Sequence, residues 1–199
     1  MTVQRILIYG EESLRQPSKE VHKVSAKIQK LVDDLYDTMY ANNGVGLAAP
    51  QIGENYRVVI LDTAIENEPS NPITLINPKI VKKWGAKSDF EGCLSFPDTY
   101  VRVRRYANVI VRARDIKGRI FTIEGNDGSL LVKALQHETD HLDGVLFVDR
   151  TRNRFETDQA LTENGLPQIN PDYLIEEPEL EEQIQDWERL NPPQSVEET

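Results

Sequence analysis

The sequence predicts an α+β fold with antiparallel β-strands between two helical stretches. Two observations lead to this expectation. Helical periodicity occurs in two separated stretches, residues 25–41 and 127–142, and the segments between them are short, rich in β-branched residues and bounded by turn residues. The order of these segments shows no repeat and no second hydrophobic core, which favours one domain with trailing sequence.

The first helix is expected over residues 25–41, with Ser25 as its N-cap and Asn42-Asn43-Gly44 as its stop. Its apolar stripe has helical spacing and consists of Ile28, Leu31, Val32, Leu35 and Met39. The next segment, "GVGLAAPQIG" over residues 44–53, holds three glycines and a proline. This composition predicts a loop whose backbone can approach another group closely.

Six short strands are expected between the loop and the second helix. They are "RVVILD", "ITLINP", "KIVKKW", "YVRVRR", "NVIVRARD" and "RIFTIEG". The alternation near residues 100–115 places valines on one face and arginines on the other: Arg102, Arg104, Arg112 and Arg114. No aromatic side chains that could stack on bases are interleaved, so a solvated sheet face is favoured over a nucleic-acid site.

Composition limits the kind of protein. A chain of 199 residues with 39% hydrophobic residues can form a core, and its single cysteine, Cys93, excludes an intrachain disulfide. We find no secretion signal and no apolar stretch of membrane-spanning length. These features predict a soluble cytoplasmic protein that does not contact a membrane.

The acidic residues are concentrated at one end of the chain. Residues 156–199 hold thirteen acidic residues and one basic residue, Arg189, although the whole chain has a net charge of −10. We therefore expect a catalytic domain over residues 1–155 and an acidic tail over residues 156–199. An amphipathic helix is predicted within the tail, at about residues 178–190, with one apolar stripe: Leu180, Ile184 and Trp187.

The predicted second helix carries the motif H-E-x-x-H. Residues four apart share a helix face, so His137 and His141 can bind one metal ion while Glu138 takes a proton from a water. A core helix whose histidines only form hydrogen bonds is the alternative.

The third metal ligand has several candidates. The elongated metzincin pattern would need histidine where the chain has Phe147, so it is excluded. Glu156 and Glu163 lie downstream, as in a thermolysin-like peptidase, and Cys93 lies in the turn-like segment "EGCLSFP". The spacing of residues alone leaves the choice between these candidates open.

Three motifs together resemble those of the peptide deformylases. They are "GVGLAAPQIG", "EGCLSFP" and "QHETDHLDG", and the likeness covers roughly residues 5–150. The segment "EGCLSFP" followed by Tyr100 is most similar to the 1B-like subgroup shared by plant organelles and some bacteria. The resemblance implies a fold in which antiparallel β-sheets surround a central metal-binding helix, and it implies hydrolysis of the formyl group from N-formylmethionine on nascent polypeptides.

The resemblance also implies a role for each site residue. The metal ligands would be Cys93, His137 and His141. The catalytic groups would be Glu138 as general base and acid, with the Gln51 side-chain amide and the Leu94 backbone N–H as donors to the oxyanion. The substrate would contact Val45, Gly46, Tyr100 and Lys133. Glu91, Arg105 and Asp140 would support the metal ligands from behind.

One divalent ion is implied, most often Fe²⁺ in this family, with Zn²⁺, Ni²⁺ or Co²⁺ able to occupy the site.

Lys133 stands where relatives often have an apolar residue, and its charge is expected to lie in water. An acidic tail would be repelled by RNA, so ribosome association is possible but is not expected through a basic C-terminal helix. A monomer is expected. Two alternatives are a metallopeptidase that uses Glu163 as third ligand, and a non-catalytic domain stapled by a metal.

Overall fold

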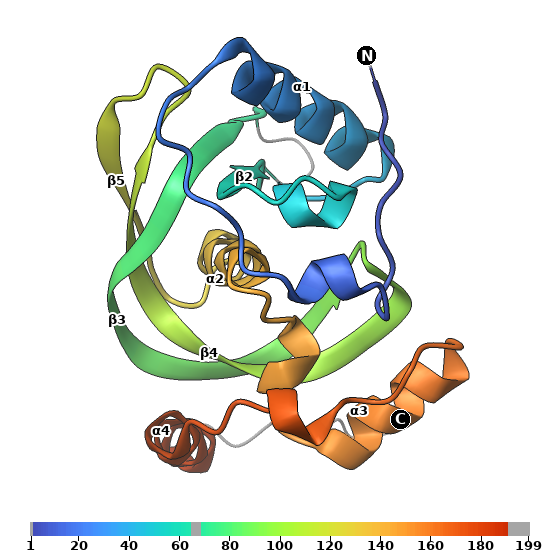
Figure 1. Cartoon of the computed structure of the whole chain (residues 1–199). Coiled ribbons are helices and arrows are strands. Elements are labelled where there is room, and N and C mark those ends of the chain that lie inside the picture. Colours follow the sequence, from blue (N-terminus) through green and yellow to red (C-terminus); the bar gives the residue numbers. More distant parts are fainter. Residues whose placement is uncertain (1, 65–68, 191–199) are drawn as a thin grey trace.

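The computed structural model describes residues 2–64 and 69–190 of the chain. One antiparallel sheet of five strands, in the order β1-β2-β3-β4-β5, bends around helix α2, which spans Leu130–Leu142. Figure 1 shows α2 enclosed by the curved sheet, with α1 covering β2 on one side and α3 and α4 beyond the opposite side. The predicted α+β class with a central helix is confirmed, but there is one continuous sheet among the described residues where several were expected.

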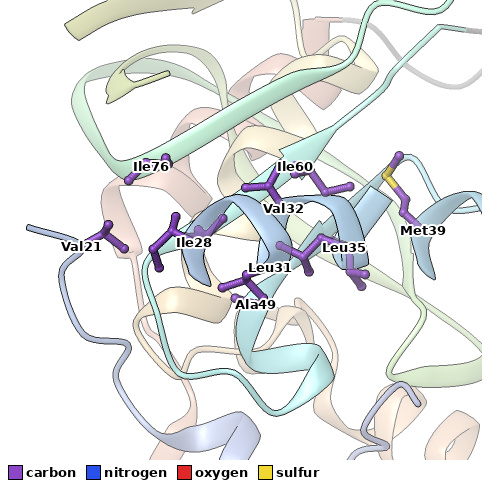
Figure 2. Packing of buried hydrophobic residues seen from close by; sticks show 11 residues of the cluster. Val21, Ile28, Leu31, Val32, Leu35, Met39, Ala49, Ile60 and Ile76 are labelled. Atoms are coloured by element: carbon purple, nitrogen blue, oxygen red, sulfur yellow. The ribbon is translucent and has the colours of Figure 1, made fainter. Parts of the chain in front are cut away.

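Helix α1 spans Ala26–Ala41, as its periodicity predicts. Its apolar stripe is buried against the sheet and the short 3₁₀ helix that follows β1, where it meets Ala49, Ile60 and Ile76 (Figure 2). Ser25 occupies the N-cap position, but its side chain makes no capping hydrogen bond. Packing of the apolar stripe therefore stabilises this helix more than its cap does.

The prediction of six short strands was wrong, because two of the strands are long. The five strands are β1 (Gly46–Ala48), β2 (Val58–Leu61), β3 (Ile73–Cys93), β4 (Phe96–Arg114) and β5 (Ile120–Gly125). The pair Asn77-Pro78, which resembles a strand end, instead forms a bulge inside β3, with Asn77 at φ +50°. The Asn77 side chain bonds to both backbone groups of Val21, so the tertiary structure holds the bulge in place.

The segment over residues 44–53 is more regular than the loop that was predicted. It contains β1, which pairs with β2, and a 3₁₀ helix over Ala49–Ile52. Gly53 ends this turn in the left-handed region at φ +80°. The segment is thus part of the rigid sheet edge that faces α2.

Helix α2 begins at Leu130, three residues later than predicted. Asp127 and Gly128 both have positive φ angles, 57° and 59°, so they form a turn that precedes the helix. Buried apolar residues fix one side of α2 against the sheet: Val132, Leu135 and Leu142. The described part of the chain has no helix long and apolar enough to cross a membrane.

The C-terminal segment follows the 3₁₀ turn Phe147–Arg150 and contains α3 (Arg154–Glu163) and α4 (Pro178–Leu190). Two more 3₁₀ turns lie elsewhere, at Glu12–Arg15 and Pro171–Tyr173. Leu180 and Ile184 of α4 are buried, as the predicted stripe requires, whereas the side chain of Trp187 lies outside the described residues. Ion pairs from Arg104 and Arg152 to Glu181, 2.6 and 2.7 Å long, hold α4 against the body.

Candidate metal centre and active site

Three potential metal ligands converge from distant parts of the chain. Cys93 ends β3 at the two-residue turn to β4, while His137 and His141 lie one turn apart on α2. Their ligand atoms all lie within 4.8 Å of one another, and Cys93 Sγ is 3.3 Å from His141 Nε2. The sheet therefore brings to the helix the third ligand that the motif H-E-x-x-H lacks.

The chemistry of this donor set fits a divalent transition metal. One thiolate and two imidazoles leave the fourth position of a tetrahedral site open, which is typical of catalytic rather than structural sites. Both histidines are buried, and His141 Nδ1 has no hydrogen-bond partner among the described residues. Small side-chain movements would bring all three donors to metal–ligand distances of about 2.0 to 2.3 Å.

Glu138 lies beside the three ligands at a close approach of α2 and β1. A β-carbon placed on Gly46 would lie 2.6 Å from Glu138 Oε1, so only glycine leaves room for the carboxylate. Burial, together with the nearby charge of Glu91, raises the pKa of Glu138 to about 7, against a lowering effect from His137. Its Oε2 has no hydrogen-bond partner within the described residues, which suits a group that exchanges protons with a bound molecule.

Gln51 directs an amide donor at the same centre. Its Oε1 accepts a hydrogen bond of 2.9 Å from the Ala48 N–H, which fixes the side chain so that Nε2 lies 3.4 Å from Cys93 Sγ and 3.2 Å from Ser95 Oγ. The N–H of Leu94, the first residue of the β3–β4 turn, donates none of the hydrogen bonds between described residues. The Leu94 N–H and the Gln51 amide, which is directed at Cys93 Sγ, thus lie where an oxyanion could form.

A buried network supports His137 from behind. Its Nδ1 lies 3.0 Å from Glu91 Oε2, and Glu91 receives two hydrogen bonds from Arg105, of 2.9 and 2.8 Å. Arg105 also contacts Asp140 on α2. Burial alone would raise the pKa of Asp140, but the guanidinium groups of Arg105 and Arg150 lower it overall. The three residues expected behind the metal ligands are therefore joined in one charged network.

Sequence reasoning missed two members of this network. Arg150 holds Asp140 with two hydrogen bonds of 2.8 and 2.9 Å and contacts Glu177 at 2.8 Å. Glu177 stands directly before α4, so the network reaches from the candidate metal ligands to the C-terminal segment. No local sequence signal connects residues 27 positions apart, and only the unusual density of charge in the tail hinted at a partner on the body.

A pocket of about 650 Å³ opens beside the candidate metal ligands. All four residues expected to contact substrate line it: Val45, Gly46, Tyr100 and Lys133. Exposed Phe90, which the sequence did not single out, lines it too. A β-carbon on Gly92 would lie 2.6 Å from the Tyr100 ring, so this glycine allows the ring to lie across the strand pair.

The Lys133 charge has a partner that the sequence did not indicate. Its Nζ lies 3.0 Å from Asp89 Oδ2, and 24% of its side chain is exposed. Asp89 lies on β3. No strand was predicted at this position, because the predicted strand "KIVKKW" ends at residue 84. An ion pair therefore borders the pocket at this position.

The two glutamates considered as third ligands lie elsewhere. Glu156 and Glu163 are exposed residues of α3, and Glu163 accepts a hydrogen bond of 2.9 Å from Gln159. Neither belongs to the group of potential ligands formed by the described residues. The thermolysin-like arrangement is therefore not supported.

Known proteins share these features. The family profile for polypeptide deformylase matches residues 3–157. A peptide deformylase of Heliobacterium modesticaldum is 46% identical over 153 residues, which are 77% of this chain and 97% of that protein. A peptide deformylase of Acetivibrio thermocellus is 45% identical over 159 residues, covering 80% of this chain and 89% of the relative.

Solved structures agree with the sequence relatives. A peptide deformylase of Synechococcus elongatus in complex with actinonin has a TM-score of 0.79 at 38% identity, covering 86% of this chain and 91% of that one. A plant peptide deformylase of type 1B has a TM-score of 0.75 at 33% identity, covering 96% and 94% of the two chains. The family profile, the relatives and the shared fold together show that this chain belongs to the polypeptide deformylase family.

Proposed function

We propose that this chain hydrolyses the N-formyl group from N-formylmethionine at the start of nascent polypeptides and releases formate. The observation that supports it most is the convergence of Cys93, His137 and His141 with Glu138 and Gln51 at one end of a pocket. Membership of a metal-dependent deformylase family adds the reaction class. The pocket beside the site can accept the methionine side chain that follows the formyl group.

Cys93, His137 and His141 would hold the metal. A divalent ion there would supply Lewis acidity to the formyl oxygen and lower the pKa of a nearby water. Glu138 accepts the proton of the attacking water and returns it to the departing amine. Burial raises the pKa of the Glu138 carboxyl, so this group holds a proton more readily than an exposed glutamate does, which suits a residue that accepts a proton and then returns it.

The oxyanion would be stabilised by two donors of this chain, the Gln51 amide and the Leu94 N–H. One such donor lowers the activation barrier by on the order of 3 kcal/mol. Gln51 is already oriented by its bond to Ala48, so little reorganisation is needed when charge develops. The close contact of Gly46 with Glu138 leaves a narrow site in which formyl, the smallest acyl group, fits better than acetyl.

Fe²⁺ is our proposal for the physiological metal, with Zn²⁺, Ni²⁺ or Co²⁺ as substitutes. A mixed thiolate and imidazole set binds several of these ions, so selection depends on availability as well as affinity. Metal analysis of protein purified without oxygen from cells grown in unsupplemented medium tests this proposal. Zinc at one equivalent per chain with no iron would contradict it.

The remaining assignments are also proposals. The enzyme would act as a cytoplasmic monomer on N-formylmethionyl nascent chains. Residues 1–155 would form the catalytic domain and residues 156–199 an acidic tail, in which Glu177 and Glu181 pair with arginines of the catalytic domain. Any ribosome association would not use α4 as a basic docking helix, because Glu177 and Glu181 of this region are engaged with the body's own arginines. Size-exclusion chromatography with light scattering tests the monomer; a stable dimer would contradict it.

The direct experiment is an assay on formyl-Met-Ala-Ser, with protein purified anaerobically. We expect formate release from this peptide and no cleavage of a peptide bond in it or in unformylated Met-Ala-Ser. Cleavage between residues of either peptide would instead favour a metallopeptidase.

A further inference from the structure

A second large groove lies at the opposite end of α2 from the substrate pocket. It encloses about 750 Å³ between β3, β4 and the residue that ends α2, Asp143. Its cationic lining consists of Arg57, Lys79, Arg112 and Arg114. None of the residues proposed for catalysis lines this groove, so its role is separate from the deformylation site.

Three of the four cations of this groove lack a partner among the described residues, and only Arg57 is paired. Lys79, Arg112 and Arg114 are exposed, and their side chains make no hydrogen bond or ion pair with another described residue. Two carboxylates also face the groove. Asp143 is held by Arg57 at 2.5 Å, which leaves Glu20 as the unpaired anion against three unpaired cations.

The sheet register places like charges directly opposite one another. Lys79 on β3 and Arg112 on β4 are cross-strand partners, immediately after the bulge at Asn77. Like charges at such positions destabilise a sheet, because their side chains lie about 5 Å apart. An anion bound to both side chains would remove the repulsion between Lys79 and Arg112.

The four arginines of the β4 face fall into two groups. Arg104 is paired with Glu181 and Arg102 lies 4.7 Å over the ring of Phe90, so both are occupied within the protein. Arg112 and Arg114 belong to the groove instead. The acidic C-terminal helix therefore neutralises one part of the arginine face and leaves the other part available.

We propose that this groove binds the phosphodiester backbone of double-helical RNA. Several unpaired cations along an open groove match a row of phosphates better than a single anion. No aromatic side chain lines the groove, so it offers no platform for stacking unpaired bases, which favours a helix over a single strand. The choice of RNA rests on the proposed function, because a nascent polypeptide emerges from an RNA-rich particle.

The test measures binding of a fluorescent RNA hairpin to the full chain by anisotropy, over a series of salt concentrations. We expect wild-type protein to bind at low salt. The variant Lys79→Glu should bind about tenfold more weakly, and the slope of log affinity against log salt should fall by about one. Lys117→Glu, the same charge change at an exposed turn residue outside the groove, should bind like wild type.

The same variant separates binding from folding. Lys79→Glu places opposite charges at the cross-strand position, so its melting temperature should equal or exceed that of wild type while RNA binding falls. Formate release should be unchanged in both variants, so a failure of RNA binding is distinguishable from a failure of the proposed activity. Equal RNA binding by wild type and Lys79→Glu, no binding by either, or full competition by millimolar inorganic phosphate would overturn the proposal.

Discussion

Gly46 and Glu138 lie so close together that a β-carbon on the glycine would meet the carboxylate oxygen at 2.6 Å. The contact joins the edge strand β1 to helix α2, so the position of the proposed general base depends on a residue far from it in sequence. The glycines of the segment over residues 44–53 were expected to let another group approach the backbone closely. The geometry shows that Gly46 makes space for the base.

Replacing Gly46 by alanine should displace Glu138. Because small misplacement of a catalytic group can cost about 100-fold in rate, we expect a fall in kcat of that order with formyl-Met-Ala-Ser. Metal content should stay at the wild-type level, because none of the three ligands contacts Gly46 in the same way. A Gly46→Ala enzyme with wild-type kcat would contradict this role.

Loss of the Gln51 side chain should reduce kcat more than loss of the Ser95 hydroxyl, to which Gln51 donates a hydrogen bond. Gln51→Ala removes the donor aimed at the oxyanion, and we expect kcat to fall about 100- to 1,000-fold with little change in KM. Ser95→Ala serves as the matched control, because it removes only the hydroxyl that accepts from Gln51 at 3.2 Å. Steady-state kinetics of both variants decide the point; equal losses would show that Gln51 acts only through its packing.

The buried network should contribute strongly to stability. Arg105→Met leaves the buried carboxylates of Glu91 and Asp140 without a shared partner, which costs about 3–5 kcal/mol of unfolding free energy. Arg119→Met breaks an exposed pair with Asp115 and should cost under about 1 kcal/mol. Denaturant unfolding of the two variants measures both values. Similar losses would mean that the buried pair is no more important than a surface one.

Docking of α4 should weaken in acid. Burial alone would raise the pKa of Glu181, but Arg152 and Arg104 lower it overall. Since its folded pKa lies below its unfolded value, its stabilising contribution is present above about pH 4.5 and is lost as pH falls through the folded pKa. Wild type should therefore melt above Glu181→Gln at pH 7, and the difference should shrink as the pH falls below about 4.5. A difference that does not change with pH would contradict this account.

The local parts of the fold could be predicted from sequence. The apolar stripes of α1 and α4 and the H-E-x-x-H spacing of α2 depend on neighbours three or four residues apart, and the structure has these helices where they were expected. Cys93, His137 and His141 were grouped only through the family resemblance. The sequence spacing itself left Glu163 as an alternative.

Contacts between distant segments could not be predicted. Asn77-Pro78 resembles the end of a strand, and only its bonds to Val21 show that the strand bends there and continues. In the same way, Lys133 pairs with Asp89, and Arg150 pairs with Glu177. Each pair joins two elements whose relative position cannot be predicted from a local sequence pattern. These long-range ion pairs surround the site, which explains why its ligands were easier to predict than its supporting residues.

Formate release by two variants decides whether Cys93 completes the proposed deformylase metal site. Cys93→Ala and Glu163→Ala, purified anaerobically beside wild type, are assayed on formyl-Met-Ala-Ser. We predict that Cys93→Ala releases no measurable formate, while Glu163→Ala retains wild-type activity, since Glu163 lies on the exposed face of α3. Activity retained without Cys93, or lost without Glu163, would contradict the account.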